Sequence, residues 1–323
     1  MIETDSRSSQ SGTMSANTIR GVQRLIEHVR NMAAVRMAVV HPCDALSLSG
    51  AIDARNAGII LPVLIAPKAK LIAVAKESGI DLTGCEIVDV PHSHAAAAAA
   101  AEMAGKGEVE ALMKGSLHTD EFLGAIVSAS AGLRTERRIS HCYVMETTAY
   151  PRPFIITDAA VNVAPTLLHK ADIVRNAITL AHALGVAEPK VAILSAVETI
   201  NPHMQSTLDA AALCKMADRG QIKGGLLDGP LALDNAVSPD AARVKGIRSA
   251  VAGQADILVV PDLESGNMLA KQLEFLGHAD SAGIVMGARV PIVLTSRADS
   301  SQTRLVSSAI ALLLADRYRN TPP

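Results

Sequence analysis

The feature that most constrains the fold of this chain is a regular alternation of short apolar runs with longer segments of helical periodicity. Arg36–Val40, Ile60–Ile65 and Glu86–Val90 are such runs, and each is followed by a stretch long enough for a helix. Short apolar runs bounded by turn residues are typical of buried strands, and strands that alternate with helices usually pair in parallel. The alternation continues along the chain, so the sequence predicts an α/β fold with mainly parallel sheets and helices on both faces.

Two segments interrupt this alternation and indicate how the chain is divided. Residues 1–17 are rich in serine and lack an apolar signal core, which is typical of a disordered leader. Tyr150–Pro153 contains two prolines, which break regular structure. A chain of 323 residues is long enough for two domains, and we expect it to cross between them near residue 150.

Composition and charge exclude several classes of partner. Thirty Lys and Arg residues nearly balance 32 Asp and Glu residues, and aromatic residues make up only 2% of the chain. Proteins that bind nucleic acid usually have basic patches and aromatic side chains on which bases stack. We therefore expect this chain to bind neither nucleic acid nor anionic membranes. No apolar run reaches the roughly 18 residues of a membrane-spanning helix.

The cysteines indicate a reducing compartment. Cys43, Cys85, Cys142 and Cys214 lie far apart in the sequence and form no CxxC pair. Such cysteines are typical of buried, reduced thiols in a cytoplasmic protein. The alternative interpretation is that one of these cysteines acts as a nucleophile.

The segment after residue 290 combines a buried strand with a polar turn. Val290–Leu294 is apolar, Ser296, Arg297 and Asp299 follow it, and Leu305–Ala315 has the composition of a buried helix. The first N–H groups of a helix favour an anion, so a hydroxyl, a guanidinium and a carboxylate beside them indicate an anion site. The alternative is that these side chains only cap the last helix.

A second polar turn follows the short apolar run Ala111–Met113. Lys114 precedes Gly115, and Thr119 adds a hydroxyl. A glycine after a strand lets backbone N–H groups approach an anion, and the lysine adds a positive charge. The spacing of a Walker phosphate loop is absent, so the turn predicts anion binding of another kind.

Three arginines lie close together after this turn. Arg134, Arg137 and Arg138 are found within five residues. A solvated face is the commoner reason for such a cluster, and an anion site is the other. We keep Arg134 as a candidate anion ligand.

Polar residues also recur where the later predicted strands end. Asp158, Asp228 and Asp262 each follow an apolar run, and Asn162 and Asn267 lie shortly beyond. In open α/β sheets, ligands bind outside the carboxyl ends of the strands. Each acid is also explained as a turn or helix cap, but their repetition predicts that they line one cleft.

The segments that carry these residues resemble the phosphate acyltransferase family, which contains phosphate acetyltransferases and phosphate butyryltransferases. The segments are LMKGSLHT (Leu112–Thr119), ITDAAVNVAPT (Ile156–Thr166), DRGQIKGGLLDGPLALDNAVS (Asp218–Ser238), VVPDLESGNM (Val259–Met268) and LTSRADS (Leu294–Ser300). They occur in the order found in the family, and the resemblance spans roughly residues 20–315. The runs MKG, GLR and DGPLALDNAVS lean toward the butyryltransferase branch.

The resemblance implies a two-domain subunit related to the isocitrate and isopropylmalate dehydrogenase fold. Residues 18–149 and 296–323 would form the first domain and residues 150–295 the second, with the active site between them and a homodimer as the usual assembly. The implied reaction exchanges a short acyl group, butyryl or acetyl, between CoA and inorganic phosphate. CoA and phosphate are then substrates, and no metal or redox cofactor is implied.

The resemblance also implies roles for individual residues. In similar enzymes the serine of a Ser-Arg pair lies near the thiol and the arginine binds an anionic group, which carries over to Ser296 and Arg297. The acetyl branch has an aspartate seven positions after this serine, where this chain has Thr303, so the general base stays open and Asp299 is the nearest acid. The candidate substrate-binding residues are Lys114, Gly115, Thr119, Arg134, Asp158, Asn162, Asp228, Asp262, Gly266 and Asn267.

Two other functions remain as alternatives. A metal- and NAD(P)-dependent decarboxylating dehydrogenase on the same fold would need clustered aspartates, of which Asp228 and Asp262 would supply two. A non-catalytic small-molecule-binding relative is the other alternative, because Thr303 cannot act as a base.

Overall fold

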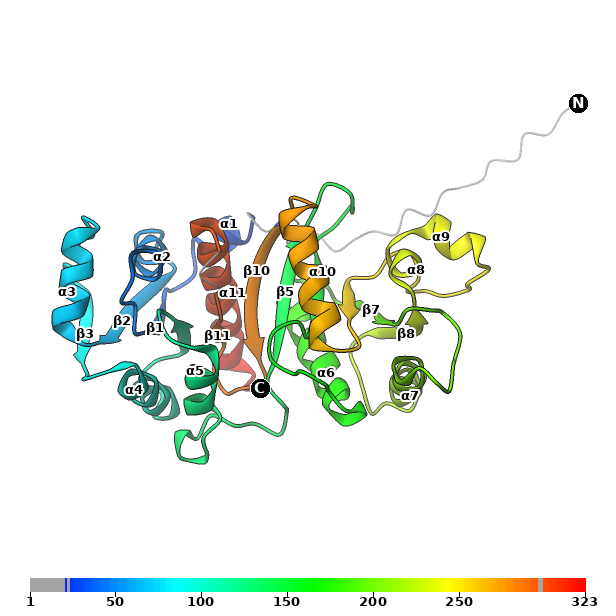
Figure 1. Ribbon diagram of the computed structural model, residues 1–323, viewed down its shortest axis with the longest axis horizontal. Coiled ribbons are helices and arrows are strands. Elements are labelled where there is room, and N and C mark those ends of the chain that lie inside the picture. Colours follow the sequence, from blue (N-terminus) through cyan, green and yellow to red (C-terminus); the bar gives the residue numbers. More distant parts are fainter. Residues whose placement is uncertain (1–20, 22–23, 296–298) are drawn as a thin grey trace, which may run out of the picture.

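The computed structural model describes residues 21, 24–295 and 299–323 (Figure 1). The predicted leader, together with Ser296 and Arg297, lies outside the described residues. The strands are β1 (Val35–Val40), β2 (Ile60–Ala66), β3 (Glu86–Asp89), β4 (Ala111–Lys114), β5 (Ser140–Glu146), β6 (Phe154–Thr157), β7 (Lys190–Leu194), β8 (Leu226–Leu231), β9 (Ile257–Val259), β10 (Asp280–Met286) and β11 (Ile292–Val293). The helices are α1 (Arg24–Val29), α2 (Ala45–Asn56), α3 (Lys68–Glu77), α4 (Ser93–Gly105), α5 (Thr119–Ile126), η1 (Ala129–Ala131), α6 (Leu167–Ala183), α7 (Gln205–Asp218), α8 (Leu233–Val237), α9 (Pro239–Val244), α10 (Leu263–Phe275) and α11 (Ser301–Asn320).

The strands form one continuous 11-stranded sheet in the order β3-β2-β1-β4-β11-β10-β5-β6-β9-β7-β8. The five strands from β3 to β11 in this order pair in parallel, and so do the four from β6 to β8. Between these groups, β10 runs antiparallel to β11 and β5, and β5 runs antiparallel to β6. The predicted α/β fold with mainly parallel pairing is confirmed, as a single mixed sheet.

The antiparallel centre reverses the strand direction between the two halves of the sheet. Three antiparallel pairings separate β11 from β6 in the strand order, so these two strands point in opposite directions. The strands of the two parallel groups therefore run in opposite directions. The loop after β6 nevertheless reaches the ends of β4 and β11, because Ala160 lines one cavity with Lys114 and Thr295.

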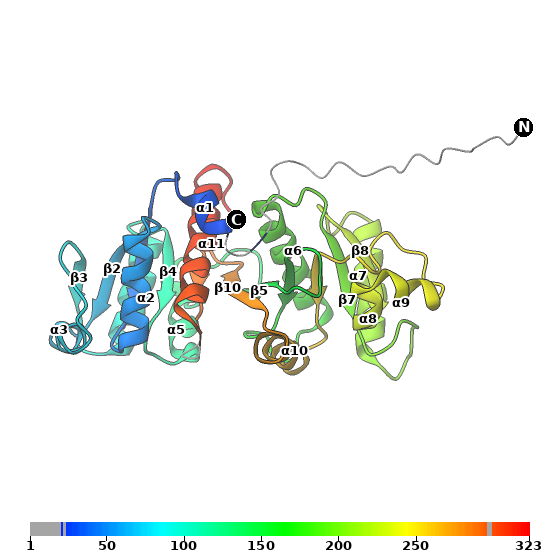
Figure 2. The ribbon, with the colours of Figure 1, turned by 90° about the horizontal axis from the view of Figure 1, so that it is seen from above.

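Helices cover both faces of the sheet, as predicted (Figure 2). On one face, α2, α6 and α11 pack into a single apolar cluster that includes Leu48, Val174 and Ile310. On the other face, α4 and α5 pack against β1 and β4, and α10 covers the second half. Burial of apolar side chains on both faces is the main stabilising term, and it holds α5 and α10 on the same face of the sheet.

One strand extends further than the sequence predicted. We expected Asp228 to lie where a strand ends, but β8 continues through Gly229 and Pro230 to Leu231. A proline is tolerated there because β8 is an edge strand, where an unpaired side of the backbone faces outward. Asp228 therefore lies within β8, paired with Ala192 of β7, and not at the end of a strand.

Candidate active site

Two adjoining cavities lie at the carboxyl ends of β4 and β11. The first, of about 470 Å³, is lined by Asp44, Ala45, Leu46, Ser47, Lys114, Gly115, Ser116, Thr295 and Arg304. The second, of about 400 Å³, is lined by Lys114, Leu117, His118, Thr119, Tyr143, Ala160, Leu294 and Thr295. Because Lys114 and Thr295 line both cavities, the two form one cleft.

The turn after β4 is shaped by Gly115. Its N–H donates to the carbonyl oxygen of Val40 at 2.9 Å, and a Cβ at this position would lie only 2.5 Å from the same oxygen. Only glycine therefore fits between β4 and the end of β1. This close approach holds Lys114, the last residue of β4, at the wall of the cleft with its side chain buried.

The start of α2 supplies an acidic wall to the first cavity. Asp44 is the N-cap of α2, and its carboxylate accepts hydrogen bonds from the backbone N–H and the hydroxyl of Ser47 at 2.8 and 2.9 Å. Burial by itself raises the pKa of the Asp44 carboxyl, but the bonds from Ser47 and Ser116 and the charge of Arg304 outweigh it and lower the pKa. Asp44 is therefore ionised near neutral pH and offsets part of the positive charge in the cleft.

A second buried cation comes from the last helix. Arg304 lies in the first turn of α11 behind the N-cap Ser300, and its Nη1 donates to Thr295 Oγ1 at 3.0 Å. Gly50 of α2 leaves room for it, since a Cβ there would lie 2.8 Å from Arg304 Cδ. A buried guanidinium and a buried ammonium that line one cavity are suited to an oxyanion such as phosphate. Arg304 was not among the residues predicted from the sequence, where its only signal is its position just before the apolar run of the last helix.

The second cavity joins the two halves of the sheet. Thr119 is the first residue of α5, Tyr143 lies in β5, and Ala160 follows β6. Burial raises the pKa of the Tyr143 phenol, and the charges of Asp299 and Glu274 raise it further. Tyr143 therefore remains a neutral hydroxyl at the cleft, and Asp299 lies near it.

The loop after β6 is held in place by Asp158. One carboxylate oxygen accepts the N–H groups of Ala160 and Val161 at 3.0 and 3.1 Å. The other accepts the N–H and the side-chain amide of Asn162 at 3.1 and 2.6 Å. Burial raises the pKa of Asp158 despite these bonds. These contacts agree with the interpretation of Asp158 as a turn cap. By holding the loop, Asp158 positions Ala160 at the second cavity and Asn162 at another cavity described below.

Three more predicted residues hold α10 against the same loop. Asp262 is the N-cap of α10, Gly266 leaves no space for a Cβ beside the end of β9, and the Asn267 amide donates to the carbonyl oxygen of Ala159 at 3.2 Å. Asp228 lies apart from them, in the edge strand β8. The structure therefore separates Asp228 from the other predicted binding residues.

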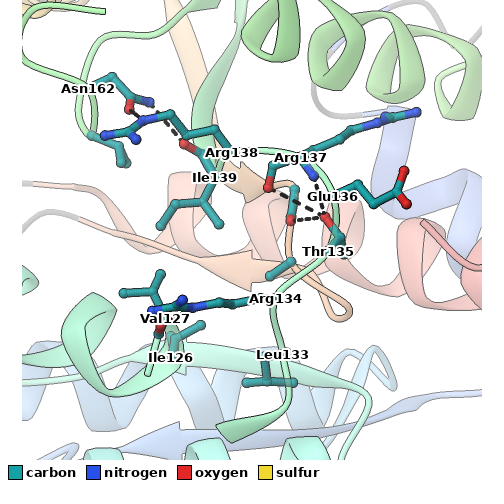
Figure 3. A pocket seen from close by; sticks show the side chains of 13 residues that line it. Ile126, Val127, Leu133, Arg134, Thr135, Glu136, Arg137, Arg138, Ile139 and Asn162 are labelled. Carbon is teal, nitrogen blue, oxygen red and sulfur yellow. Dashed lines mark hydrogen bonds between the residues drawn. The ribbon is translucent and has the colours of Figure 1, made fainter. Parts of the chain in front are cut away.

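A third cavity, of about 430 Å³, lies at the other end of α5 (Figure 3). Arg134 and Asn162 line it together with the segment that leads into β5. Of the predicted binding residues, Lys114, Gly115 and Thr119 line the cleft, whereas Arg134 and Asn162 line this third cavity.

Cys43, Cys142 and Cys214 do not provide an activated thiol. Burial raises the pKa of Cys43, and it raises the pKa of Cys142 and Cys214 to about 12. The thiolate is the nucleophilic form, so these thiols are poor nucleophiles near neutral pH.

Metal clusters and membrane spans are absent from the part of the chain that the structure describes. No group of three or more His, Cys, Asp or Glu side chains within residues 24–295 and 299–323 could hold a metal ion. Among the helices of this same part, none is long and apolar enough to cross a membrane.

The cleft lies in a region that matches a known protein family. The family model described as "Phosphate acetyl/butaryl transferase" matches residues 92–312, which include Lys114, Tyr143, Thr295 and Arg304. The chain belongs to this family. It is therefore an acyltransferase, and the resemblance inferred from the sequence is confirmed. A decarboxylating dehydrogenase is not favoured.

Relatives in the phosphate acetyl/butyryl transferase family are similar over nearly the whole chain. A phosphate acetyltransferase of Rhizobium meliloti is 60% identical over 296 residues, which are 92% of this chain and 94% of that protein. A phosphate butyryltransferase of Clostridium acetobutylicum is 42% identical over 297 residues, covering 92% of this chain and 99% of the relative. The identities therefore do not follow the lean toward the butyryl branch that the sequence motifs suggested.

Solved structures of a transferase and of a dehydrogenase share the fold. A branched-chain phosphotransacylase from Enterococcus faecalis superposes with a TM-score of 0.77 at 30% identity, over 87% of this chain and 99% of that one. A 4-hydroxythreonine-4-phosphate dehydrogenase from Klebsiella pneumoniae superposes with a TM-score of 0.54 at 14% identity, over 88% and 98% of the two chains. The second similarity concerns the fold alone, and it agrees with the predicted relation to a dehydrogenase fold.

Proposed function

We propose that this transferase exchanges a short acyl group, with acetyl preferred, between CoA and inorganic phosphate, so that acyl-CoA and phosphate give acyl phosphate and CoA. Family membership supports the reaction. The higher identity to a protein named phosphate acetyltransferase supports acetyl as the acyl group. The observation that carries the proposal is the cleft in which the buried cations Lys114 and Arg304 line one cavity beside the end of β11.

In this proposal, phosphate binds between Lys114 and Arg304. Two cations compensate for the desolvation of a doubly charged anion, and they fix its oxygen atoms for attack on the thioester carbonyl. Negative charge develops on the carbonyl oxygen in the tetrahedral transition state, and donors that are already in place stabilise it. We assign this role to the neutral hydroxyls of Thr119 and Tyr143, which line the adjoining cavity.

The resemblance supports further roles for the predicted catalytic residues. Ser296 lies near the sulfur atom in this assignment, Arg297 binds an anionic group of a substrate, and Asp299 acts near the same cavity. Phosphate attacks as an anion and CoA leaves as a thiolate whose conjugate acid has a pKa of about 8.5, so the forward step depends little on a general base. The presence of Thr303 where the acetyl branch has an acid is compatible with catalysis that depends on positioning the two substrates for reaction.

We further propose a cytoplasmic homodimer that needs no cofactor besides its substrates. Free cysteines support a reducing compartment. Met268, Phe275 and Leu276 expose 65%, 63% and 77% of their surface along α10 and just past its end. Large exposed apolar side chains on one helix are typical of interfaces, which supports α10 as the contact between two copies.

Initial rates with acetyl-, propionyl- and butyryl-CoA test the proposed function. Free thiol is measured with phosphate present and with sulfate in its place. We expect phosphate-dependent release with the highest kcat/KM for acetyl-CoA. A higher kcat/KM for butyryl-CoA would overturn the acetyl preference, and no phosphate-dependent release from any of the three would overturn the reaction.

A further inference from the structure

The first cavity of the cleft contains an acid as well as its cations. Asp44 lines it together with the buried side chains of Lys114 and Arg304, which we place against phosphate. A carboxylate beside a bound oxyanion repels it, because like charges interact strongly in a poorly solvated site. Asp44 also caps α2, but asparagine and serine cap helices about as well. The cap alone therefore does not explain a charged side chain at this place.

The carboxylate of Asp44 is held in place by the segments around it. It accepts hydrogen bonds from the backbone N–H and the hydroxyl of Ser47, and a further one from the side chain of Ser116 in the turn after β4. That turn is tied to the end of β1, because Ser116 N–H donates to the carbonyl oxygen of His41 at 2.9 Å and His41 Nδ1 donates to the carbonyl oxygen of Ser116 at 3.1 Å. The position of the carboxylate relative to Lys114 is thus set before a ligand arrives.

The guanidinium of Arg304 belongs to the same arrangement. Helix α11, which carries Arg304, packs beside α2, which Asp44 caps (Figure 2). A Cβ at Gly50 of α2 would lie 2.8 Å from Arg304 Cδ, so the arginine stem passes closely over this helix. The charge of Arg304 also acts on the Asp44 carboxyl. In a cavity of about 470 Å³ that these side chains line together, an oxyanion at the cations lies beside the carboxylate.

An ionised carboxylate selects ligands by their hydrogen atoms. The bonds from Ser47 and Ser116 and the charge of Arg304 lower the pKa of Asp44, so its carboxyl group carries no proton near neutral pH and can only accept hydrogen bonds. A carboxylate has about four acceptor sites, which is more than the described donors from Ser47 and Ser116 occupy. A hydrogen atom on a ligand can bind at the site that remains. Near neutral pH, inorganic phosphate and arsenate carry such a hydrogen, whereas sulfate carries none.

We propose that Asp44 makes this cavity select hydrogen phosphate over sulfate. The hydroxyl group of the phosphate donates to the Asp44 carboxylate, while its other oxygen atoms face Lys114 and Arg304. Sulfate has the same charge and nearly the same size, but any sulfate oxygen that faces the carboxylate brings one acceptor against another, and this leaves both without a hydrogen bond. This inference rests on the proposed function, because it takes inorganic phosphate as the substrate that occupies the cavity.

Anion affinities measured by titration calorimetry test the assignment without the need for turnover. Inorganic phosphate, sulfate and arsenate are titrated into the wild type and into Asp44→Asn, which keeps a helix cap but loses the charge. We expect the wild type to prefer phosphate to sulfate by at least about 10-fold. The variant should lower this ratio by about 10- to 100-fold, the range for one hydrogen bond to a charged group. The ratio of phosphate to arsenate affinity should not change, because both anions carry a proton.

Two further variants control for the cap and for negative charge in general. Asp44→Ser retains a capping hydroxyl without a carboxylate and should show the same loss of selectivity. Asp53→Asn removes an exposed charge from the same helix and should keep the wild-type ratio, since solvent screens that charge. Thermal unfolding checks that the variants are folded. An unchanged ratio of phosphate to sulfate affinity in the folded Asp44 variants, or equal affinities of the wild type for the two anions, would overturn the assignment.

Inhibition by sulfate separates this inference from the proposed function. In the thiol-release assay, the ratio of Ki for sulfate to KM for phosphate should fall in Asp44→Asn by the factor found in calorimetry. Turnover by both enzymes with an unchanged ratio would overturn the role of Asp44 and leave the reaction standing. Selective binding of phosphate that depends on Asp44, in an enzyme without turnover, would support the role of Asp44 and overturn the reaction.

Discussion

Replacing Lys114 by methionine isolates the charge that we place against phosphate. Lys114 is 7% exposed and lines both cavities of the cleft, so solvent screens its interaction with an anion only weakly. A hydrogen bond to a charged group contributes about 1.5–3 kcal/mol, and 1.36 kcal/mol corresponds to tenfold in rate. We therefore expect Lys114→Met to lower kcat/KM for phosphate by about 10- to 150-fold.

The assay varies phosphate at saturating acetyl-CoA and then acetyl-CoA at saturating phosphate. KM for phosphate should rise while KM for acetyl-CoA stays within about twofold, because the lost charge faces phosphate in this account. Methionine retains the length of the lysine stem, so the melting temperature should change little. Lys76→Met, at an exposed position of α3, is the control. A folded Lys114→Met enzyme with wild-type kcat/KM for phosphate would refute the reasoning.

Three further predictions concern the same region. Arg297→Lys should lose most activity, since lysine cannot reproduce the forked contact of a guanidinium with phosphate oxygens, and unchanged kinetics would place Arg297 outside the site. Thr303→Asp should not raise kcat/KM, because it adds negative charge near an anionic substrate, whereas Asp299→Asn should lower it; a large gain in the first without loss in the second would reverse the assignment. Burial, with a smaller effect of Lys271, lowers the pKa of His141 from 6.5 to about 3. The unfolded state then binds a proton that the folded state does not, so the free energy of unfolding falls as pH drops below 6.5, by about 2 kcal/mol between pH 7 and 5. Urea unfolding of His141→Phe should therefore show a flatter dependence of this free energy on pH than the wild type. Equal pH dependence in the two proteins would contradict the buried neutral state.

The local features of the cleft were accessible from the sequence. Lys114 and Gly115 follow an apolar run directly, and a strand followed by a glycine turn places both at the end of β4 without knowledge of the rest of the chain. Asp262 as a helix cap was also accessible, because capping depends on neighbours within three residues.

The remaining parts of the site depend on contacts between distant segments. Asp44 and Arg304 are 260 positions apart in the numbering, and only the packing of α11 beside α2 brings them to one cavity. The direction of the later strands was not accessible either. Alternation of strands and helices predicts parallel pairing, whereas β5 and β10 pair in antiparallel fashion at the centre, so that the later parallel strands run opposite to the earlier ones.

Phosphorus NMR of a reaction with acetyl-CoA and inorganic phosphate tests the central claim most directly, because it observes the bond that the enzyme is proposed to form. We expect an acetyl phosphate resonance that grows as inorganic phosphate declines, with one free thiol released for each acetyl phosphate formed. Free thiol without acetyl phosphate would indicate hydrolysis of the thioester. Unchanged phosphate and thiol signals in the presence of folded enzyme would contradict the account.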